Sequence, residues 1–389
     1  MTNKSKKVLA VLFLVCIFVV SLGTAWNIRG TIKKLVKADS ITAAQTKLED
    51  AVTKKLQWHN NWVNINGLFQ RCLGVTIVRA SDSGDNVYKL SNGQIMYWLE
   101  ERDMTDYAEL VDNFKKSLEK DGIDFTYVQL PFKVQNDDAM PVGTKDYAND
   151  NADQLVSLLR EDDIDTLDLR EEIEKAGFDW DTLFFNTDHH WRPTTGLWAS
   201  GVIMDHLRDN YDFTVDDSHY QYDSYNSTVY KDYLLGTLAR KTGKYYAGLD
   251  DLEILEPKFE TDFTFYAKGD NGVDEREGDF MHSMYNWDNM AQKASFDLPT
   301  YEVYFGKDYA YSKIVNRLTD SDKKILLIGE SARAVLLPFM STDAKEVVSV
   351  DLRRYKDKTV LELCEEYQPD VVILAYNPSA FSKEQFTFQ

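Results

Sequence analysis

The chain has 389 residues, which is enough for one large α/β domain or for two domains of ordinary size. Apolar residues make up 43% of it, so a substantial hydrophobic core is expected. The formal net charge of -20 argues against a nucleic-acid partner, because binding nucleic acid needs clustered Lys and Arg. The acidic residues are dispersed, with local clusters such as Asp250-Asp251, and we interpret most of them as a solvated surface.

The three cysteines predict neither a metal site nor a required disulfide. Cys16 lies in an apolar N-terminal stretch, and nothing in the spacing of Cys72 and Cys364 requires them to pair. The sequence has no Cys-x-x-Cys motif and no Cys/His cluster, so it predicts no structural zinc site and no other cofactor.

Residues 1–27 are predicted to form an N-terminal signal anchor. Three lysines precede an apolar run at residues 8–22, and extension to Trp26 brings it close to the roughly 17–20 residues that span a bilayer. The alternative is a cleaved leader, since small residues end the run at Ala25. We expect the rest of the chain to lie outside the cell membrane, anchored to it or secreted if the leader is cleaved.

Residues 28–85 are predicted to form a juxtamembrane helical stalk and linker, because apolar residues recur there at helical spacing. Residues 86–389 are predicted to form an α/β domain. Residues 211–310 within it are rich in Tyr and turns, and we expect an irregular or β-rich insertion. The expected strands are 93–99, 125–130 and 166–169, and the expected helices are 106–120, 153–160, 170–176 and 193–207.

The C-terminal part predicts a β–α–β–α–β series. Apolar runs at 324–328, 346–350 and 371–374 are typical of buried parallel strands, and helices are expected at 335–340 and 359–367. This order predicts an open, mostly parallel sheet with helices on both faces.

Ser331 follows the first of these strands in the sequence Gly329-Glu330-Ser331. Sites in open parallel sheets form where strands end, and backbone N–H groups at a helix start can stabilise an oxyanion there. A serine at this point is a candidate nucleophile. The alternative is that Ser331 is an ordinary helix N-cap.

The second motif is Asp188-His189-His190-Trp191, on a loop before the helix expected at Pro193. In extended backbone Asp188 and His190 point to the same side, and His189 points to the other. An Asp beside a His fixes its tautomer and stabilises the imidazolium, as the base of a serine nucleophile requires. Two alternatives stay open: a metal site made by Asp188, His189 and His190, and a purely structural hydrogen-bonded cluster.

Two further polar residues fall near the predicted strand ends. Arg333 lies two residues after Ser331, and it would bind an anionic substrate group or form a surface salt bridge. Asn377 follows the last apolar strand at the same sheet edge, where it would reach the site or serve as a turn residue.

The string at residues 188–191, followed by a helix and later by a strand that ends in Gly-Glu-Ser, resembles the DHHW protein family. It is also similar to the SGNH-hydrolase-like proteins of alginate and related exopolysaccharide O-acetylation. The resemblance covers about residues 90–200 and 320–380. It implies that residues 86–389 form an SGNH-like catalytic domain, with the insertion at about 211–310.

The resemblance implies a catalytic triad in which Asp188 orients His190, His190 is the base and Ser331 is the nucleophile that carries an acetyl group. Glu330 stands where the more familiar block has Asp. The residues expected to bind substrate or support the site are His189, Trp191, Glu330, Arg333 and Asn377.

The implied function is extracytoplasmic O-acetylation of a cell-surface or secreted polysaccharide in a bacterial cell envelope. A membrane-bound O-acyltransferase is the expected source of acetyl groups, and neither a metal nor another cofactor is expected. A glycan acetylesterase with the same triad and a non-catalytic glycan-binding or assembly protein are the alternatives.

Overall fold

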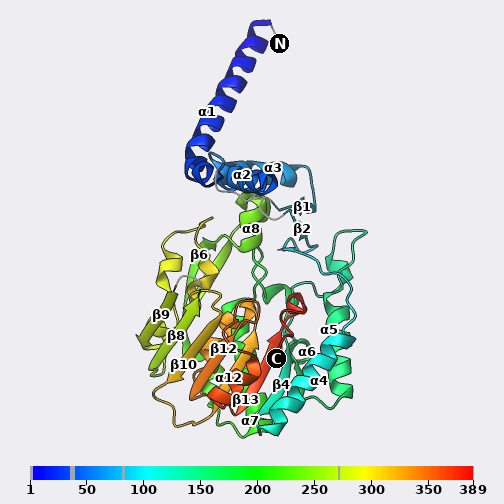
Figure 1. Ribbon diagram of the computed structural model, residues 1–389, viewed down its shortest axis with the longest axis vertical. Coiled ribbons are helices and arrows are strands. Elements are labelled where there is room, and N and C mark those ends of the chain that lie inside the picture. Colours follow the sequence, from blue (N-terminus) through cyan, green and yellow to red (C-terminus); the bar gives the residue numbers. More distant parts are fainter. Residues whose placement is uncertain (1–2, 36–39, 81–83, 270–271, 389) are drawn as a thin grey trace.

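The computed structural model describes residues 3–35, 40–80, 84–269 and 272–388. In this part of the chain an eight-stranded sheet forms the centre of the molecule, in the order β5-β4-β13-β11-β12-β10-β8-β9 (Figure 1). Its strands are β4 (Asp124–Gln129), β5 (Thr166–Asp168), β8 (Phe263–Gly269), β9 (Gly272–Gly278), β10 (Tyr311–Asn316), β11 (Lys324–Gly329), β12 (Glu346–Val350) and β13 (Val371–Tyr376).

The five strands from β5 to β12 run parallel, whereas β10, β8 and β9 continue the sheet in antiparallel pairs. The prediction of an open α/β sheet with helices on both faces is confirmed, and the sheet is mixed. Every residue of β13 is buried, which explains why its sequence is apolar throughout. Because β12 and β13 lie on opposite sides of β11, the chain leaves the carboxyl end of β11 at a topological switch point.

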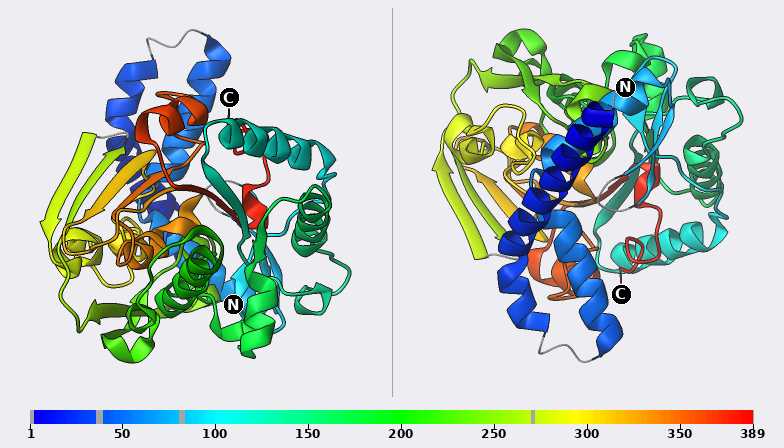
Figure 2. Two further views of the ribbon diagram at one scale, coloured as in Figure 1. Left: turned by 90° about the horizontal axis from the view of Figure 1, so that it is seen from below. Right: turned by 90° about the horizontal axis from the view of Figure 1, so that it is seen from above.

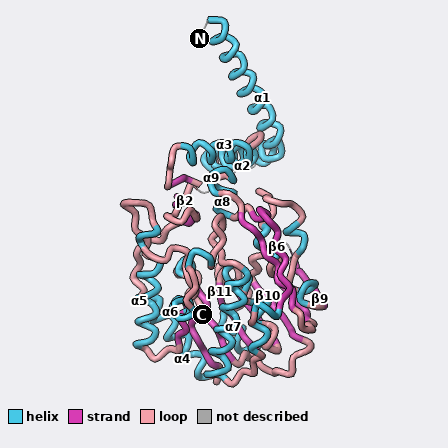
Figure 3. The backbone as a smooth tube through the Cα atoms, turned by 180° about the vertical axis from the view of Figure 1, so that it is seen from behind, coloured by secondary structure: helices cyan, strands magenta, loops and turns pink. Residues whose placement is uncertain are grey.

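Helices cover both faces of the sheet (Figures 2 and 3). Ile325 and Leu327 of β11 point into a core shared with α6, α7 and α11, whereas Leu326 and Ile328 point into a core shared with α4, α5 and α12. This alternation follows from the two-residue period of a strand. The helices are α4 (Thr105–Lys120), α5 (Ala148–Glu161), α6 (Leu169–Ala176), α7 (Pro193–Tyr211), α11 (Leu337–Met340) and α12 (Val360–Tyr367).

The N-terminal part lies on one side of this domain (Figure 1). It consists of α1 (Asn3–Leu35), α2 (Ile41–Lys55) and α3 (His59–Cys72). In the described part of the chain, only the helical segment Lys4–Ile32 is long and apolar enough to cross a membrane, with a mean hydropathy of 2.8 in its most apolar window. The N-terminal helix is therefore a candidate membrane anchor.

A small antiparallel sheet follows, formed by β1 (Ile77–Arg79), β2 (Asn86–Lys89) and β3 (Ile95–Met96). The strand expected over residues 93–99 is wrong in its extent, because the chain leaves the sheet after Met96. The backbone N–H of Leu99 instead donates to the Asp146 carboxylate at 2.7 Å.

The described residues of the 211–310 region form two groups of strands and three short α-helices, with 3₁₀ turns between them. A separate ribbon pairs β6 (Tyr225–Leu234) with β7 (Asp250–Pro257), whereas β8 and β9 belong to the main sheet. The helices described there are α8 (Thr237–Thr242), α9 (Lys244–Ala247) and α10 (Phe280–Ser283). Part of the region predicted as an insertion is thus continuous with the central sheet.

Candidate active site

Ser331 begins a 3₁₀ turn, Ser331–Val335, immediately beyond the carboxyl end of β11. Its Oγ lies 2.8 Å from Nε2 of His190 and 3.0 Å from a carboxylate oxygen of Glu330. The interpretation of Ser331 as the N-cap is wrong, because the Glu330 side chain caps this turn by accepting the N–H of Ala332 at 2.8 Å. The Ser331 hydroxyl is therefore available to His190.

His190 and Asp188 are held together by two hydrogen bonds. Nδ1 of His190 lies 2.7 Å from Oδ1 of Asp188, and the backbone N–H of His190 donates to the same oxygen at 3.2 Å. The other oxygen of Asp188 accepts the N–H of Thr237, the first residue of α8, at 2.6 Å. Burial raises the pKa of the Asp188 carboxyl, but the charge and hydrogen bond of His190 outweigh burial and hold this pKa well below 3.8.

His189 does not point away from His190, as the extended-backbone interpretation expects. The chain bends at residues 186–190, and the two imidazole rings lie 3.8 Å apart between centroids. Burial, together with the neighbouring charge of His190, lowers the pKa of His189 to about 3, so its imidazole is neutral at pH 7. His189 therefore packs beside the base as an uncharged ring.

The possible ligand atoms of Asp188, His189 and His190 lie within 4.8 Å of one another, the spacing that a metal site requires. Both ring nitrogens of His190 are already engaged, however, one by Asp188 and the other by Ser331. Nδ1 carries the proton that it donates to Asp188 and so has no lone pair for a metal, and the lone pair of Nε2 faces the Ser331 hydroxyl. This donor set fits proton transfer better than metal binding.

Tyr301 forms a wall of the site. Its ring stacks on His190 with 4.0 Å between centroids and 9° between planes. The two residues line a small pocket that also contacts Ser331, Phe305 and Ala334. The Tyr301 hydroxyl is buried and has no hydrogen-bond partner among the described residues. The pocket thus offers a small space beside the Ser331 hydroxyl.

We expect Tyr301→Ala to lower kcat by roughly 10²-fold, because misplacing a catalytic group by about 1 Å costs this much. Tyr301→Phe keeps the stacked ring and should retain nearly normal kcat. Steady-state kinetics with an acetyl ester compare the two variants. A comparable loss in both would assign the effect to the hydroxyl instead of the ring.

Glu330, Asn377 and Trp191 connect the ends of the strands to the loop that carries His190. Asn377 donates its side-chain amide to Glu330 at 2.8 Å, and Trp191 donates its indole N–H to the carbonyl of Ala332 at 3.0 Å. Burial raises the pKa of the Glu330 carboxyl, while Arg353 acts in the opposite direction. These contacts support the turn at Ser331, and neither Glu330 nor Asn377 is a free oxyanion donor.

Arg333 is not on the surface, so the prediction of a surface salt bridge is wrong. Its side chain is 2% exposed, and its guanidinium donates to the carbonyls of Gly329, Glu330 and Tyr309 and to the hydroxyl of Ser349. These bonds join the end of β11 to β12 and to the chain before β10. Arg333 therefore holds the turn in place, and it also lines the pocket beside Ser331.

Sequence reasoning missed two buried residues that hold the loop from behind. Asp250, interpreted as part of a solvated cluster, is 2% exposed and accepts the backbone N–H groups of Asn186 and Thr187 at 2.8 and 2.7 Å. Lys133 donates to the backbone carbonyls of Ile95 and Asp188 at 3.0 and 2.5 Å. Burial lowers the pKa of the Lys133 ammonium to about 7, against the opposing effect of Asp250.

We expect Lys133→Met to lower the free energy of unfolding by about 3 kcal/mol, because it leaves buried carbonyl groups without a donor. The variant should also lower kcat, since the loop that carries Asp188 loses an anchor. Urea unfolding and ester kinetics measure the two effects. Lys116→Met is the matched control, because Lys116 is an exposed residue of α4 whose only ion pair among the described residues is with Asp112. A normal kcat in a destabilised Lys133→Met would restrict Lys133 to stability.

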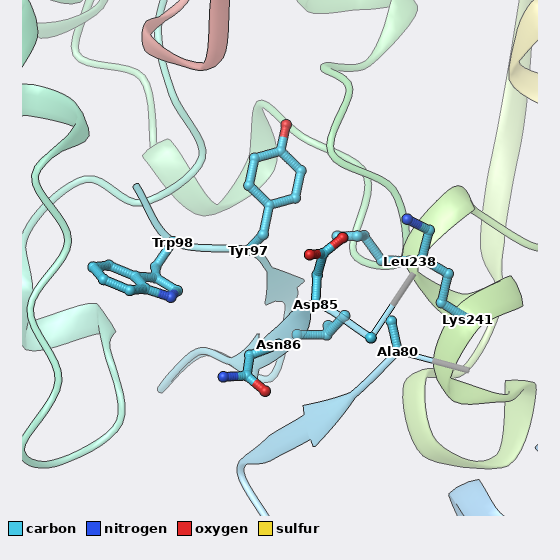
Figure 4. Close-up of a pocket in the computed structure, with 9 residues that line it drawn as sticks. Ala80, Asp85, Asn86, Tyr97, Trp98, Leu238 and Lys241 are labelled. Atoms are coloured by element: carbon cyan, nitrogen blue, oxygen red, sulfur yellow. The ribbon is translucent and has the colours of Figure 1, made fainter. Parts of the chain in front are cut away.

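A larger cleft, open to solvent, lies beside the site (Figure 4). Tyr97 and Trp98 line it together with residues of β2 and α8. The Tyr97 ring lies 5.8 Å from that of His189, and in Figure 4 its hydroxyl points away from Asp85 and Lys241. The cleft therefore approaches the Asp188–His190 loop at Tyr97.

Comparison with known proteins agrees with this fold. Residues 94–247 match the ALGX family model, described as the SGNH hydrolase-like domain of acetyltransferase AlgX, whereas no curated protein matches the chain at a significant level. The structure of Bacillus cereus PatB1 with a sulfonyl adduct has a TM-score of 0.64 at 18% identity, over 78% of this chain and 98% of that one. A DHHW family protein from Eubacterium siraeum has a TM-score of 0.59 at 16% identity, over 80% and 97%. The predicted resemblance is confirmed: the chain has an SGNH-like α/β fold, and it is similar to the AlgX SGNH hydrolase-like domain and to the DHHW family.

Proposed function

We propose that this protein is an extracytoplasmic O-acetyltransferase that acts on a cell-surface or secreted polysaccharide. The observation that carries the proposal is the chain of contacts from Ser331 Oγ to His190 Nε2 at 2.8 Å and from His190 Nδ1 to Asp188 Oδ1 at 2.7 Å. This is the arrangement that activates a serine hydroxyl for acyl transfer. The match to the SGNH hydrolase-like domain of acetyltransferase AlgX supports the acetyl group as the cargo.

In the first half-reaction Ser331 Oγ attacks the carbonyl carbon of the acetyl donor and gives its proton to Nε2 of His190. The Asp188 carboxylate, which accepts from Nδ1, stabilises the imidazolium that forms. When the tetrahedral intermediate collapses, the leaving group of the donor takes the proton from His190. Acetyl-Ser331 is the product of this step.

In the second half-reaction a sugar hydroxyl gives its proton to His190 and attacks the acetyl carbon. Ser331 Oγ leaves as the bond breaks and recovers the proton from His190. The backbone N–H of Ser331, at the start of the 3₁₀ turn, is the proposed oxyanion donor. Water in place of the sugar hydroxyl would make the same residues an esterase, so exclusion of water decides the outcome.

We place the polysaccharide acceptor in the cleft beside Tyr97 (Figure 4), where aromatic and polar side chains line a space open to solvent. The acetyl donor is proposed to be a membrane-bound O-acyltransferase, because the candidate anchor α1 keeps the domain near the membrane.

We expect Trp98→Ala to raise KM for an oligosaccharide acceptor several-fold and to leave hydrolysis of a small acetyl ester unchanged. Loss of both activities together would argue against an acceptor role for the cleft.

The test uses the full chain, a chromogenic acetyl ester and a panel of oligosaccharides. A transferase produces acetylated oligosaccharide, detected as a gain of one acetyl group in mass, and the acceptor speeds release of the chromophore. Release of acetate alone would replace the transferase by an esterase, and no release would remove the enzymatic proposal.

A covalent probe tests the nucleophile independently. Because the structure of PatB1 is described with a sulfonyl adduct, we expect a sulfonyl fluoride to modify this chain once, at Ser331. Peptide mass spectrometry locates the adduct. Modification of another residue, or of none, would count against Ser331 as the nucleophile.

A further inference from the structure

Helix α3 has two faces, and one of them packs on the catalytic domain. Val63, Asn64 and Gly67 are buried against α8 and α9. A Cβ atom at Gly67 would lie 2.4 Å from the carbonyl oxygen of Thr242, so only glycine allows this approach. Asn64 accepts the backbone N–H of Lys244 at 2.8 Å. These contacts fix the rotation of α3 about its own axis.

The opposite face of α3 is apolar and exposed. Successive large side chains recur there at intervals of three or four residues, which places them in one stripe along the helix. The exposure is high, with Phe69 at 63% and Leu73 at 77%. This surface, which we name the α3 stripe, consists of Trp58, Trp62, Ile65, Phe69 and Leu73.

The α3 stripe is tied to the candidate membrane helix. Thr24 of α1 accepts the backbone N–H of Gln57 at 3.0 Å, and Asn27 donates to the carbonyl of Lys55 at 3.2 Å. The stripe thus begins one residue after the contact with α1. Beyond that contact the apolar run of α1 projects away from the catalytic domain (Figure 1). Helices α2 and α3 lie between this run and the catalytic domain (Figures 1 and 2).

Basic and acidic residues are separated along the chain at the end of α3. Residues 28–73 contain eight basic residues (Lys and Arg) and three acidic residues (Asp and Glu). Residues 74–389 contain 33 basic and 61 acidic residues. Trp26, at the end of the apolar run, is 67% exposed and stacks with the guanidinium of Arg29 at 4.1 Å. Tryptophan and basic residues are the side chains that favour the boundary between lipid and water.

We propose that the α3 stripe lies in the headgroup region of the bilayer that α1 crosses, on the side of the catalytic domain. An amphipathic helix with Trp, Phe and Ile on one face binds a bilayer in this way. Anionic lipid attracts the basic segment and repels the acidic domain, so both charges favour the same orientation. The catalytic domain is then held against the membrane in a fixed orientation and does not swing on a flexible tether. This inference rests on α1 as the membrane span and is independent of the proposed activity.

The test measures the depth of a spin label on the full chain. Cys16→Ser and Cys72→Ser remove the two exposed cysteines, and Cys364 is buried. Phe69→Cys then carries the label on the stripe, and Glu109→Cys carries it on an exposed turn of α4 as the matched control. The chain is reconstituted into vesicles of phosphatidylcholine and phosphatidylglycerol that hold no other protein. Relaxation by oxygen, which concentrates in lipid, and by a water-soluble nickel chelate gives the depth.

We expect the label at position 69 to be relaxed more by oxygen than by the nickel chelate, and the label at position 109 to show the reverse. Omission of phosphatidylglycerol should reduce the difference at position 69. A water-exposed label at position 69 in these vesicles would overturn the proposal and would leave a protein partner as the occupant of the stripe. Equal urea unfolding midpoints of both labelled chains and the unlabelled chain verify that the substitutions leave the domain folded.

Discussion

Ser331→Ala should lower kcat for acetyl transfer by roughly 10⁴-fold or more, because removal of a nucleophilic serine leaves only binding and oxyanion stabilisation. The hydroxyl lies just beyond the end of β11, within hydrogen-bond distance of the imidazole of His190. Alanine keeps the backbone N–H that begins the turn, so the oxyanion donor is preserved. Transfer from an acetyl ester to an oligosaccharide, measured under saturating ester, gives kcat directly.

Ser157→Ala is the matched control, since Ser157 is exposed on α5 and its hydroxyl contacts only Glu161 among the described residues. It should leave kcat unchanged. Ser331→Ala itself should unfold in urea at nearly the wild-type midpoint, because Glu330, and not Ser331, caps the turn. If Ser331→Ala stays folded and keeps even a tenth of the activity, the serine is not the nucleophile.

The central sheet could be predicted because the local sequence of its strands is distinctive. The runs 324–328, 346–350 and 371–374 are apolar apart from Lys324, Glu346 and Ser349, as expected when both faces of a strand are buried. A glycine followed by a polar pair at the end of the first run then indicates the strand-to-turn transition where Ser331 lies. Local sequence was sufficient at these positions, because burial on both faces of a strand produces a nearly continuous apolar run that is visible in the sequence.

The support of the site could not be predicted, because it depends on contacts between distant segments. Tyr301 stacks on His190 from more than a hundred residues away, and Lys133 reaches the carbonyl of Asp188 from the loop that follows β4. Asp250 looks like a surface acid in sequence, although it is buried on the Asn186–Thr187 backbone. The residue type does not reveal whether a polar side chain is buried or exposed, so only the fold distinguishes the two cases.

The position of His189 shows a different limit. Alternation along a strand places His189 opposite His190, but the two rings lie 3.8 Å apart because the chain bends. The bend is imposed by Asp250 and Lys133, which bind backbone groups of residues 186–188. Periodicity therefore predicted the pairing of Asp188 with His190 and failed for the residue between them.

Asp188→Asn should lower kcat by about 10⁴-fold, because an amide in place of the carboxylate favours the wrong imidazole tautomer. Nδ1 of His190 now meets Oδ1 of a carboxylate at 2.7 Å, an acceptor that keeps the proton on Nδ1 and leaves Nε2 free for Ser331. An asparagine amide can donate to Nδ1, which moves the proton to Nε2 and removes the base. Single-turnover kinetics with an acetyl ester separate this chemical defect from binding, with exposed Asp150→Asn as the control.

The same substitution has a pH signature in stability. The folded pKa of Asp188 lies well below 3.8, so the ionised carboxylate stabilises the fold above the unfolded pKa of about 3.9 and loses this effect as the pH falls through the folded pKa. Asp188→Asn lacks this dependence. Urea unfolding should thus show a larger difference between wild type and Asp188→Asn at pH 7 than at about pH 2, because the advantage of the carboxylate shrinks once the pH falls below the unfolded pKa. A constant difference across this range, together with normal kcat, would mean that Asp188 neither holds the charge of His190 nor orients its ring.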